Sequence, residues 1–312
     1  MRKAMLMRLL FSRLNVLQAT HLVVYRESNL IFASRFLRHK CLRNGDRMKV
    51  KKNFSLKLGL FIMIILLLMI IVNFFYQPYS SNAMDGNMKF SAPSAKHIMG
   101  TDNYGRDIYV RTVEGMKVTF IVAVATVAIG LFFGIIIGAF TGYYGGIIDE
   151  VLMRLNDALA SFPSILLALI FVSILGSGKY KIIISLGIIF IPSFARIVRS
   201  EFIKLKHMDY VKSARLMKAS NLRVMFVHML PNAIPTIITS VAIGFNNAVL
   251  AESSMSFLGI GVQPPNASLG RMLSEAKGYI FSAPWASIFP GLMIILLILS
   301  FVLISEGVSE LK

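Results

Sequence analysis

The chain has little charge for its length, and it has only one cysteine and one tryptophan. Charged residues make up 15% of its 312 residues, whereas 56% are hydrophobic, and the mean hydropathy is +0.69. Soluble globular domains carry about a quarter charged residues. This scarcity of charge excludes an ordinary soluble domain and indicates a protein that lies within a membrane.

The residues that metal and thiol chemistry need are also scarce. Cys41 is alone, so it cannot form an internal disulfide or contribute to a thiolate cluster. No histidine has a His or Cys partner at metal-ligand spacing, and serines such as Ser161 and Ser256 lack the nucleophile-elbow pattern. We therefore expect no cofactor, no metal, no catalytic residue and no enzyme activity. The histidines are His21, His39, His97, His207 and His228.

Acidic residues are outnumbered by basic ones, 15 against 33, which gives a formal net charge of +18. In an apolar chain such an excess favours cytoplasmic loops that face anionic membrane lipid. No basic domain with interleaved aromatic residues stands outside the apolar runs, so nucleic acid is not expected as a partner.

Six apolar runs are close to the roughly 20 residues with which a helix crosses about 30 Å of hydrocarbon. Lipid cannot satisfy free backbone polar groups, so each run must be helical. The sequence thus predicts an all-α integral membrane protein with six transmembrane helices. The fourth run loses its uncharged character after Ala195, and we expect Arg196 and Arg199 to snorkel to an interface and extend it. The runs are Leu58–Tyr76, Val118–Gly142, Ala158–Leu175, Ile182–Val198, Ile234–Ala251 and Trp285–Ile304.

Basic residues set the expected orientation, because they gather in cytoplasmic loops. One group precedes the first run and a second group follows the fourth. With six spans, both termini are then cytoplasmic, residues 77–116 and 260–284 form outer loops, and residues 142–157 form an inner loop. The two groups are Lys49, Lys51, Lys52 and Lys57, and Lys204, Lys206, Lys212, Arg215, Lys218 and Arg223.

Residues 1–47 carry many arginines, few acids and no apolar run long enough to cross a membrane. Arg8 interrupts the opening apolar stretch and argues against a secretory signal, while the arginine-rich composition superficially resembles a transit peptide. We favour a basic cytoplasmic tail, or untranslated sequence upstream of a start at Met48.

The stretch SILGSGKY, residues 173–180, comes nearest to a nucleotide-binding motif. Ser173 stands where a phosphate loop needs its first glycine, and Tyr180 stands where it needs a Ser or Thr for magnesium. A tight outer hairpin between two spans is favoured, and the chain is not expected to bind ATP. An ion-coupled secondary carrier is disfavoured as well, because ionisable residues are nearly absent from the six runs.

The segment DYVKSARLMKASNLRVMFVHMLPNAIP, residues 209–235, separates two apolar runs. Its hydrophobic residues follow helical spacing in two halves, and Ser220 or Asn221 could cap the second half. Pro231 and Pro235 are expected to end the element and begin the fifth span. The pattern fits a pair of helices that rest on the membrane surface. It fits equally well a docking site for a separate subunit that supplies the energy for transport. The hydrophobic residues are Val211, Ala214 and Met217, and then Leu222, Met225, Phe226, Met229 and Leu230.

The same segment resembles the coupling segment, or EAA loop, of permease subunits in ATP-binding-cassette (ABC) importers. Lys212, Ser213 and Ala214 stand at the Glu-Ala-Ala positions, and Lys218 stands at the family's glycine. Other stretches resemble the C-type permease of the dipeptide, oligopeptide and nickel group, in the same order as in that group. These stretches are GTDNYGRDIYVR, SFPSILLAL, PSFARIVRSE, SFLGIGVQPP and FPGLMIILLILSF.

The resemblance begins near Lys52 and implies a type I ABC importer transmembrane domain with cytoplasmic coupling helices, in the plasma membrane of a prokaryote. It implies a basic tail (1–53), a first transmembrane helix with an extracellular loop (54–116) and the permease domain (117–312). The implied partners are a B-type permease in a heterodimer, two ATPase subunits and an extracellular substrate-binding protein.

The resemblance also implies which residues couple to the ATPase subunits. Val211, Ala214 and Met217 would supply apolar contact, with Arg215 and Lys218 as a polar rim. The full implied set is Tyr210, Val211, Lys212, Ser213, Ala214, Arg215, Met217, Lys218, Ala219, Ser220, Leu230 and Pro231.

Short peptides are the expected cargo, and nickel or a metal chelate is the alternative. The runs offer no His, Cys or acid cluster to strip water from nickel, although a chelate could pass through a neutral pathway. The small and polar residues of TSVAIGFNNAVLAESS, residues 239–254, suit a wide lumen or simply allow close helix packing.

Overall fold

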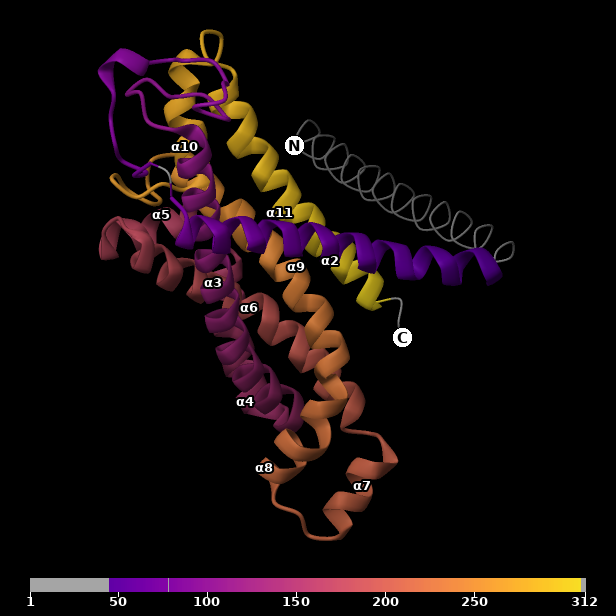
Figure 1. The fold of residues 1–312 in the computed structure, drawn as a ribbon. Helices are drawn as coiled ribbons and strands as arrows, with labels where there is room; N and C mark the ends of the chain where they lie inside the picture. Colours follow the sequence, from indigo (N-terminus) through magenta and orange to yellow (C-terminus); the bar gives the residue numbers. More distant parts are fainter. Residues whose placement is uncertain (1–44, 78, 310–312) are drawn as a thin grey trace, which may run out of the picture. The chain divides into compact units, whose positions relative to one another are not determined.

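The computed structural model describes residues 45–77 and 79–309, and the regular elements among these residues are helices (Figure 1). The all-α prediction is thereby confirmed. The chain divides into two compact units, residues 1–54 and 55–312, and the account below concerns the second unit. The interpretation of residues 1–47 as a tail or an untranslated leader falls largely outside the described residues.

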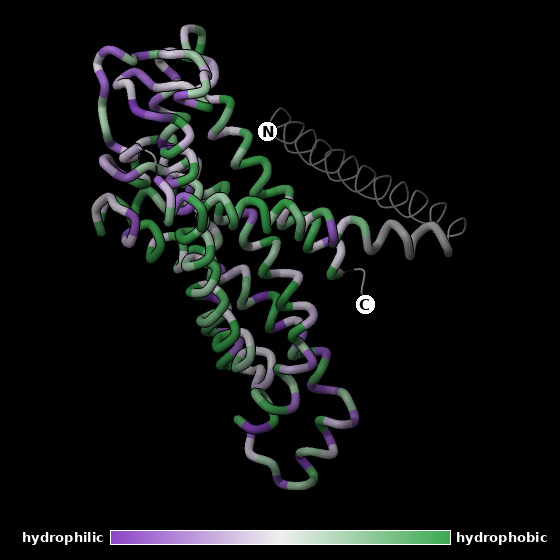
Figure 2. The backbone as a smooth tube through the Cα atoms, viewed as in Figure 1, coloured by the Kyte–Doolittle hydropathy of each residue, from purple (hydrophilic) through white to green (hydrophobic). Residues whose placement is uncertain are grey.

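Five helices of the described part are long and apolar enough to cross a membrane. α3 has 37 residues, which at 1.5 Å per residue gives about 55 Å, well beyond the hydrocarbon thickness. Figure 2 shows apolar residues along these helices and hydrophilic residues in the connections at their ends. The five are α2 (Gly45–Phe75), α3 (Ile108–Tyr144), α6 (Lys179–Leu205), α9 (Leu230–Phe257) and α11 (Trp285–Ser309).

The third predicted crossing, Ala158–Leu175, is not one helix. α4 (Gly146–Ala160) and α5 (Ser164–Leu175) are separated by a short break and bent by 90°. Pro163 lies in the break, where it lacks a backbone donor and disfavours the helical conformation of the residue before it. The described chain therefore has six crossings only if this bent pair serves as one of them.

Arg196 and Arg199, which are expected from the sequence to extend the fourth run at an interface, each pair with an aspartate. Arg199 makes a two-pronged ion pair with Asp149 of α4, with distances of 2.6 and 2.7 Å, and Arg196 lies 2.8 Å from Asp157. Two arginines on α6 thus meet two aspartates on α4. The carboxylates, not an interface alone, allow the helix to continue to Leu205.

α3 and α6 approach each other closely through a row of glycines on α3. A Cβ atom at any of the four would come within 2.5 to 2.8 Å of an atom of α6. Real side chains do not tolerate such contacts, so the glycines permit the two backbones to pack together. The four are Gly130, Gly134, Gly138 and Gly142.

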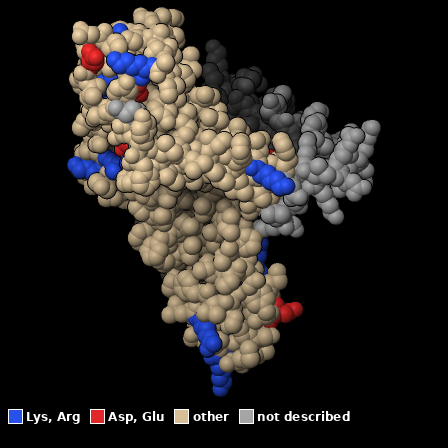
Figure 3. All heavy atoms as spheres, viewed as in Figure 1, with Lys and Arg blue, Asp and Glu red and all other residues tan. Residues whose placement is uncertain are grey.

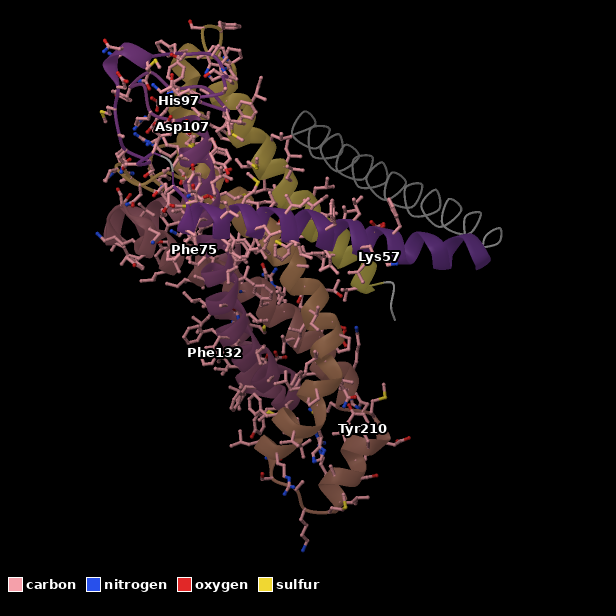
Figure 4. The ribbon with its side chains drawn as sticks, in the orientation of Figure 1. Lys57, Phe75, His97, Asp107, Phe132 and Tyr210 are labelled. Carbon is pink, nitrogen blue, oxygen red and sulfur yellow. The ribbon has the colours of Figure 1, made fainter. Side chains whose placement is uncertain are left out.

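The remaining elements lie at two opposite ends of the described helices (Figure 1). One end, called here the α10 end, holds residues 79–107 with η1 (Gly86–Met88), α10 (Leu269–Ala276) and η3 (Lys277–Tyr279). The other, the α7 end, holds α7 (Asp209–Leu216), α8 (Asn221–Arg223) and the π-helical η2 (Val224–Met229). Figure 4 labels His97 and Asp107 at the first end and Tyr210 at the second.

Ion pairs connect the loop before α3 and the first turn of α3 to α10. Arg106 and Arg111 both contact Glu275 of α10, at 2.8 and 3.2 Å, and Arg106 also lies 2.6 Å from Asp102. Burial, together with the Asp102 and Glu275 carboxylates, raises the pKa of Tyr279 to about 12. Between the two ends, much of the face shown in Figure 3 is uncharged.

Candidate functional site

Residues 209–230 form two helical pieces joined by a turn, as their amphipathic pattern predicts. Ser220 is the N-cap of the second piece, and its Oγ accepts a long hydrogen bond, 3.4 Å, from the Arg223 N–H. The first piece ends in a Schellman motif: the Ala219 N–H donates to the Ala214 carbonyl, and the Lys218 N–H donates to the Arg215 carbonyl. This motif needs a left-handed residue, and Lys218 provides it with φ of 57°.

The buried face of α7 packs against the protein's own helices. Val211 and Ala214 lie in one buried cluster with Phe202 of α6 and with Val224 and Met225 of η2. Their side chains are consequently inaccessible to a partner protein. Val211 and Ala214 hold α7 in place, because its apolar stripe packs against the chain's own helices.

The C-terminal end of α7 offers two large apolar side chains to solvent, Leu216 in its last position and Met217 as its C-cap. Leu216 is 84% exposed and Met217 is 78% exposed, and Leu222 at the start of α8 is exposed as well. Met217 belongs to the set expected from the sequence, whereas Leu216 does not. Exposed apolar side chains of this kind mark an interaction surface when they stand together.

The polar members of the expected set surround this pair. Lys212 forms an exposed ion pair with Asp209, 2.9 Å long, and a pair of that kind contributes little to stability. The side chains with exposed positions are Tyr210, Lys212, Ser213, Arg215, Lys218 and Ser220, while Ala219 is half-buried.

Contacts with Tyr143, the second-last residue of α3, tie the segment to the spans. The Tyr143 hydroxyl lies 2.8 Å from Asn221 Oδ1, and the Arg215 guanidinium stacks 4.8 Å above the Tyr143 ring. A Tyr210–Asn232 hydrogen bond connects α7 to α9; burial raises the pKa of Tyr210, and this hydrogen bond opposes the rise.

No loop separates the segment from α9, which corrects the expected break at the prolines. Residues Asn221–Phe257 form one helical run, in which the Leu230 N–H donates to the Met225 carbonyl, a π-helical bond. Pro231 lies in the first turn of α9 and Pro235 lies inside it. A helix tolerates the backbone N–H that proline lacks when neighbouring turns rearrange. π-Helical turns of this kind occur often at functional sites.

Two further expectations concern chemistry. In the part of the chain that the structure describes, no group of three or more His, Cys, Asp and Glu residues could hold a metal ion. The stretch SILGSGKY forms the end of α5, the connection Gly176–Gly178 and the start of α6. A helix, rather than the strand that a phosphate loop requires, precedes its glycines.

Five or six membrane-crossing helices define a polytopic membrane protein, and the α7 segment at one end exposes large apolar side chains. The chain belongs to the family described as binding-protein-dependent transport system inner membrane component, which matches residues 130–310. It is thus a permease subunit of an ABC transporter and not itself an enzyme.

Relatives of known designation support this assignment over most of the chain. The dipeptide transport system permease protein DppC of Alkalihalophilus pseudofirmus is 37% identical over 262 residues, which are 84% of this chain and 86% of that protein. The glutathione transport system permease protein GsiD of Pectobacterium atrosepticum is 36% identical over 265 residues, 84% of this chain and 87% of that protein.

A solved structure shares the fold. The MetNI methionine ABC transporter in an inward-facing conformation matches with a TM-score of 0.50 and 19% sequence identity. The match covers 63% of this chain and 95% of that one. The likeness extends to the helical arrangement of the transporter's membrane component.

Proposed function

We propose that this chain forms half of the translocation pathway of a peptide importer and that α7 docks an ATPase subunit. The single observation that carries the docking is the exposed pair Leu216 and Met217 on a helix whose other face is fixed by Val211 and Ala214. A rigid helix with an apolar tip fits a groove on a partner, the usual way in which an amphipathic helix is recognised.

Force on such a helix would pass into the spans along defined contacts. α7 packs on α6 and η2 through one buried cluster, Arg215 stacks on Tyr143 of α3, and η2 continues into α9. A close-packed interior transmits displacement instead of absorbing it. ATP-driven movement of the docked subunits would therefore shift three spanning helices together.

Single substitutions by aspartate at Leu216 and at Met217 test the docking. Each places a charge in an apolar contact, and we expect co-purification of the ATPase subunits and peptide uptake to fall at least about tenfold. The control is Met84→Asp, because Met84 is 65% exposed but lies at the α10 end. Normal ATPase co-purification by both α7 variants, at normal membrane abundance, would refute the docking.

The remaining features of the proposal follow from charge and family. The basic α7 end and both termini lie in the cytoplasm, a B-type permease supplies the other half of the pathway, and two ATPase subunits and an extracellular binding protein complete the complex. Residues 1–53 form a basic tail, residues 54–116 the first helix and outer loop, and residues 117–312 the permease domain. α3 runs through residue 117 without a break, so the last boundary divides functions and not structural elements.

Peptides are proposed as cargo on the designations of the relatives, which name dipeptide and glutathione transport. Nickel or a metal chelate is the alternative. The test is uptake by the reconstituted complex of both permeases, both ATPases and the binding protein. We expect labelled di- and oligopeptides to accumulate and to compete with any nickel-chelate uptake. Nickel uptake that excess peptide leaves unchanged, without peptide accumulation, would reverse the assignment.

A further inference from the structure

Glu252 is a fully buried carboxylate inside a membrane-spanning helix. Its side chain is 0% exposed, and it lies one residue beyond the fifth apolar run, in the part of α9 that reaches the α10 end. Glu252 lies outside that run but inside the helix, because α9 continues to Phe257. An ionisable side chain at such a position is costly to bury, so it calls for a functional explanation.

Hydroxyl groups from two helices bond to this carboxylate. Thr119 of α3 donates to one oxygen at 2.8 Å, and Ser256 of α9 donates to the other at 2.7 Å. Each hydroxyl oxygen also accepts a backbone N–H, Thr119 from Leu269 at 3.4 Å and Ser256 from Val262 at 3.1 Å. Each hydroxyl thus bonds both to the Glu252 carboxyl group and to a backbone N–H of another segment, so it links α9 to the loop or to α10.

The bonded backbone groups belong to different segments. Leu269 begins α10, and Val262 lies in the loop of residues 258–268 between α9 and α10. Glycines bring these segments in tightly: a Cβ at Gly261 would collide with Ser256, and one at Gly270 would collide with the Ser253 backbone. One carboxylate therefore organises α3, α9, the loop and the start of α10.

The same helical run carries the candidate docking segment at its far end. Asn221–Phe257 is continuous, and its 37 residues span about 55 Å at 1.5 Å per residue. Whatever displaces the α7 end of this run acts on Glu252 at the α10 end. To transmit a movement, this helical run must be firmly attached to its neighbours at both of its ends.

We infer that Glu252 is a positioning residue that joins α3, α9, α10 and the loop 258–268 into one body, so that movement of α9 is carried to the α10 end of the pathway. The inference rests on the proposed coupling at α7. Without the acceptor, the hydroxyl hydrogens lose their partner and the loop is released from α9.

The test uses the complete transporter with Glu252→Gln, Thr119→Val and Ser256→Ala. Gln keeps the shape but places an NH2 group opposite hydroxyl hydrogens.

Two readouts are measured. One is the amount of peptide transported per ATP hydrolysed. The other is the rate of thiol labelling of Ala267→Cys, a buried loop position, in a chain whose Cys41 is replaced by serine. We expect transport per ATP to fall and labelling to accelerate, each by about tenfold or more, as the loss of a buried hydrogen-bond partner predicts. ATPase activity without binding protein should stay within about twofold.

Matched controls come from the same two helices. Ser240 of α9 donates only to Ile237 within its own helix, and Thr141 of α3 donates to Ile137 and Gly138 within its own. Ser240→Ala and Thr141→Val should leave both readouts unchanged. The inference is overturned if the Glu252 and Ser256 variants match these controls, or if labelling accelerates while transport per ATP stays normal.

The two proposals fail in different ways. If both the Leu216→Asp and the Met217→Asp variants still dock ATPase subunits, the coupling proposal is lost, whereas the labelling of Ala267→Cys still reports whether Glu252 holds the loop. Should Glu252→Gln prevent assembly, the smaller changes at Thr119 and Ser256 decide by the same two readouts.

Discussion

Lys218 holds a left-handed backbone conformation at the end of α7, with φ of 57°. This conformation costs a residue with a side chain about 1 kcal/mol or more, and glycine avoids that cost. Lys218→Gly should therefore stabilise the protein by about 1 kcal/mol, measured as a higher thermal unfolding midpoint in detergent. Lys212→Gly, inside the same helix, should instead destabilise it by a similar amount. A lower midpoint for Lys218→Gly would contradict the Schellman geometry.

Tyr279 provides a prediction about pH. Its pKa is raised from 10.0 to about 12, so folding favours the neutral phenol. That contribution to stability is complete below pH 10, the ordinary pKa, and is lost as the pH rises through about 12. The near-ultraviolet phenolate titration of wild type minus Tyr279→Phe should show a midpoint near 12. A midpoint at the ordinary value would mean that Tyr279 is solvated and remote from Asp102 and Glu275.

At the scale of elements, the close packing of α3 on α6 determines how much one added methyl group destabilises the fold. A Cβ at Gly138 would stand 2.6 Å from the Ala195 carbonyl oxygen and 2.9 Å from the Arg199 nitrogen. Backbone atoms of a packed helix cannot move aside cheaply. Gly138→Ala should thus destabilise the fold by about 1–3 kcal/mol, despite alanine's better helix propensity.

Thermal unfolding of the purified chain in detergent measures this effect. Gly278→Ala is the control, because an added Cβ at Gly278 meets nothing within 4 Å. Equal unfolding midpoints for the two variants would show that α3 and α6 are not in close contact. Four glycines at four-residue spacing are visible in the sequence, but the partner helix that they face is not.

At the scale of the whole molecule, the chain is a permease subunit whose family works with separate ATPase subunits, and its stretch SILGSGKY joins two helices. The purified chain should neither bind nor hydrolyse ATP, as measured by calorimetry and phosphate release. The complex with its ATPase subunits, assayed in parallel, should do both. Saturable ATP binding by the chain alone would contradict this division of labour.

The sequence by itself determined the helical class, the positions of most spans and the two halves of the docking segment. Whether a segment partitions into lipid or water depends on its local composition. An amphipathic pattern repeats within one or two helical turns. Both signals therefore come from residues that are neighbours in the chain. The left-handed conformation of Lys218 was not predicted, because a lysine gives no local signal for it.

Only the tertiary structure decided what each side chain faces. It turned Val211 inward and left Leu216 exposed, it paired Arg199 with Asp149, and it enclosed Glu252 with Thr119 from a helix 133 residues away. These outcomes depend on groups distant in sequence that the fold brings within a few ångströms. The free energy of burying a charge is set by such neighbours and not by the residues beside it in the chain.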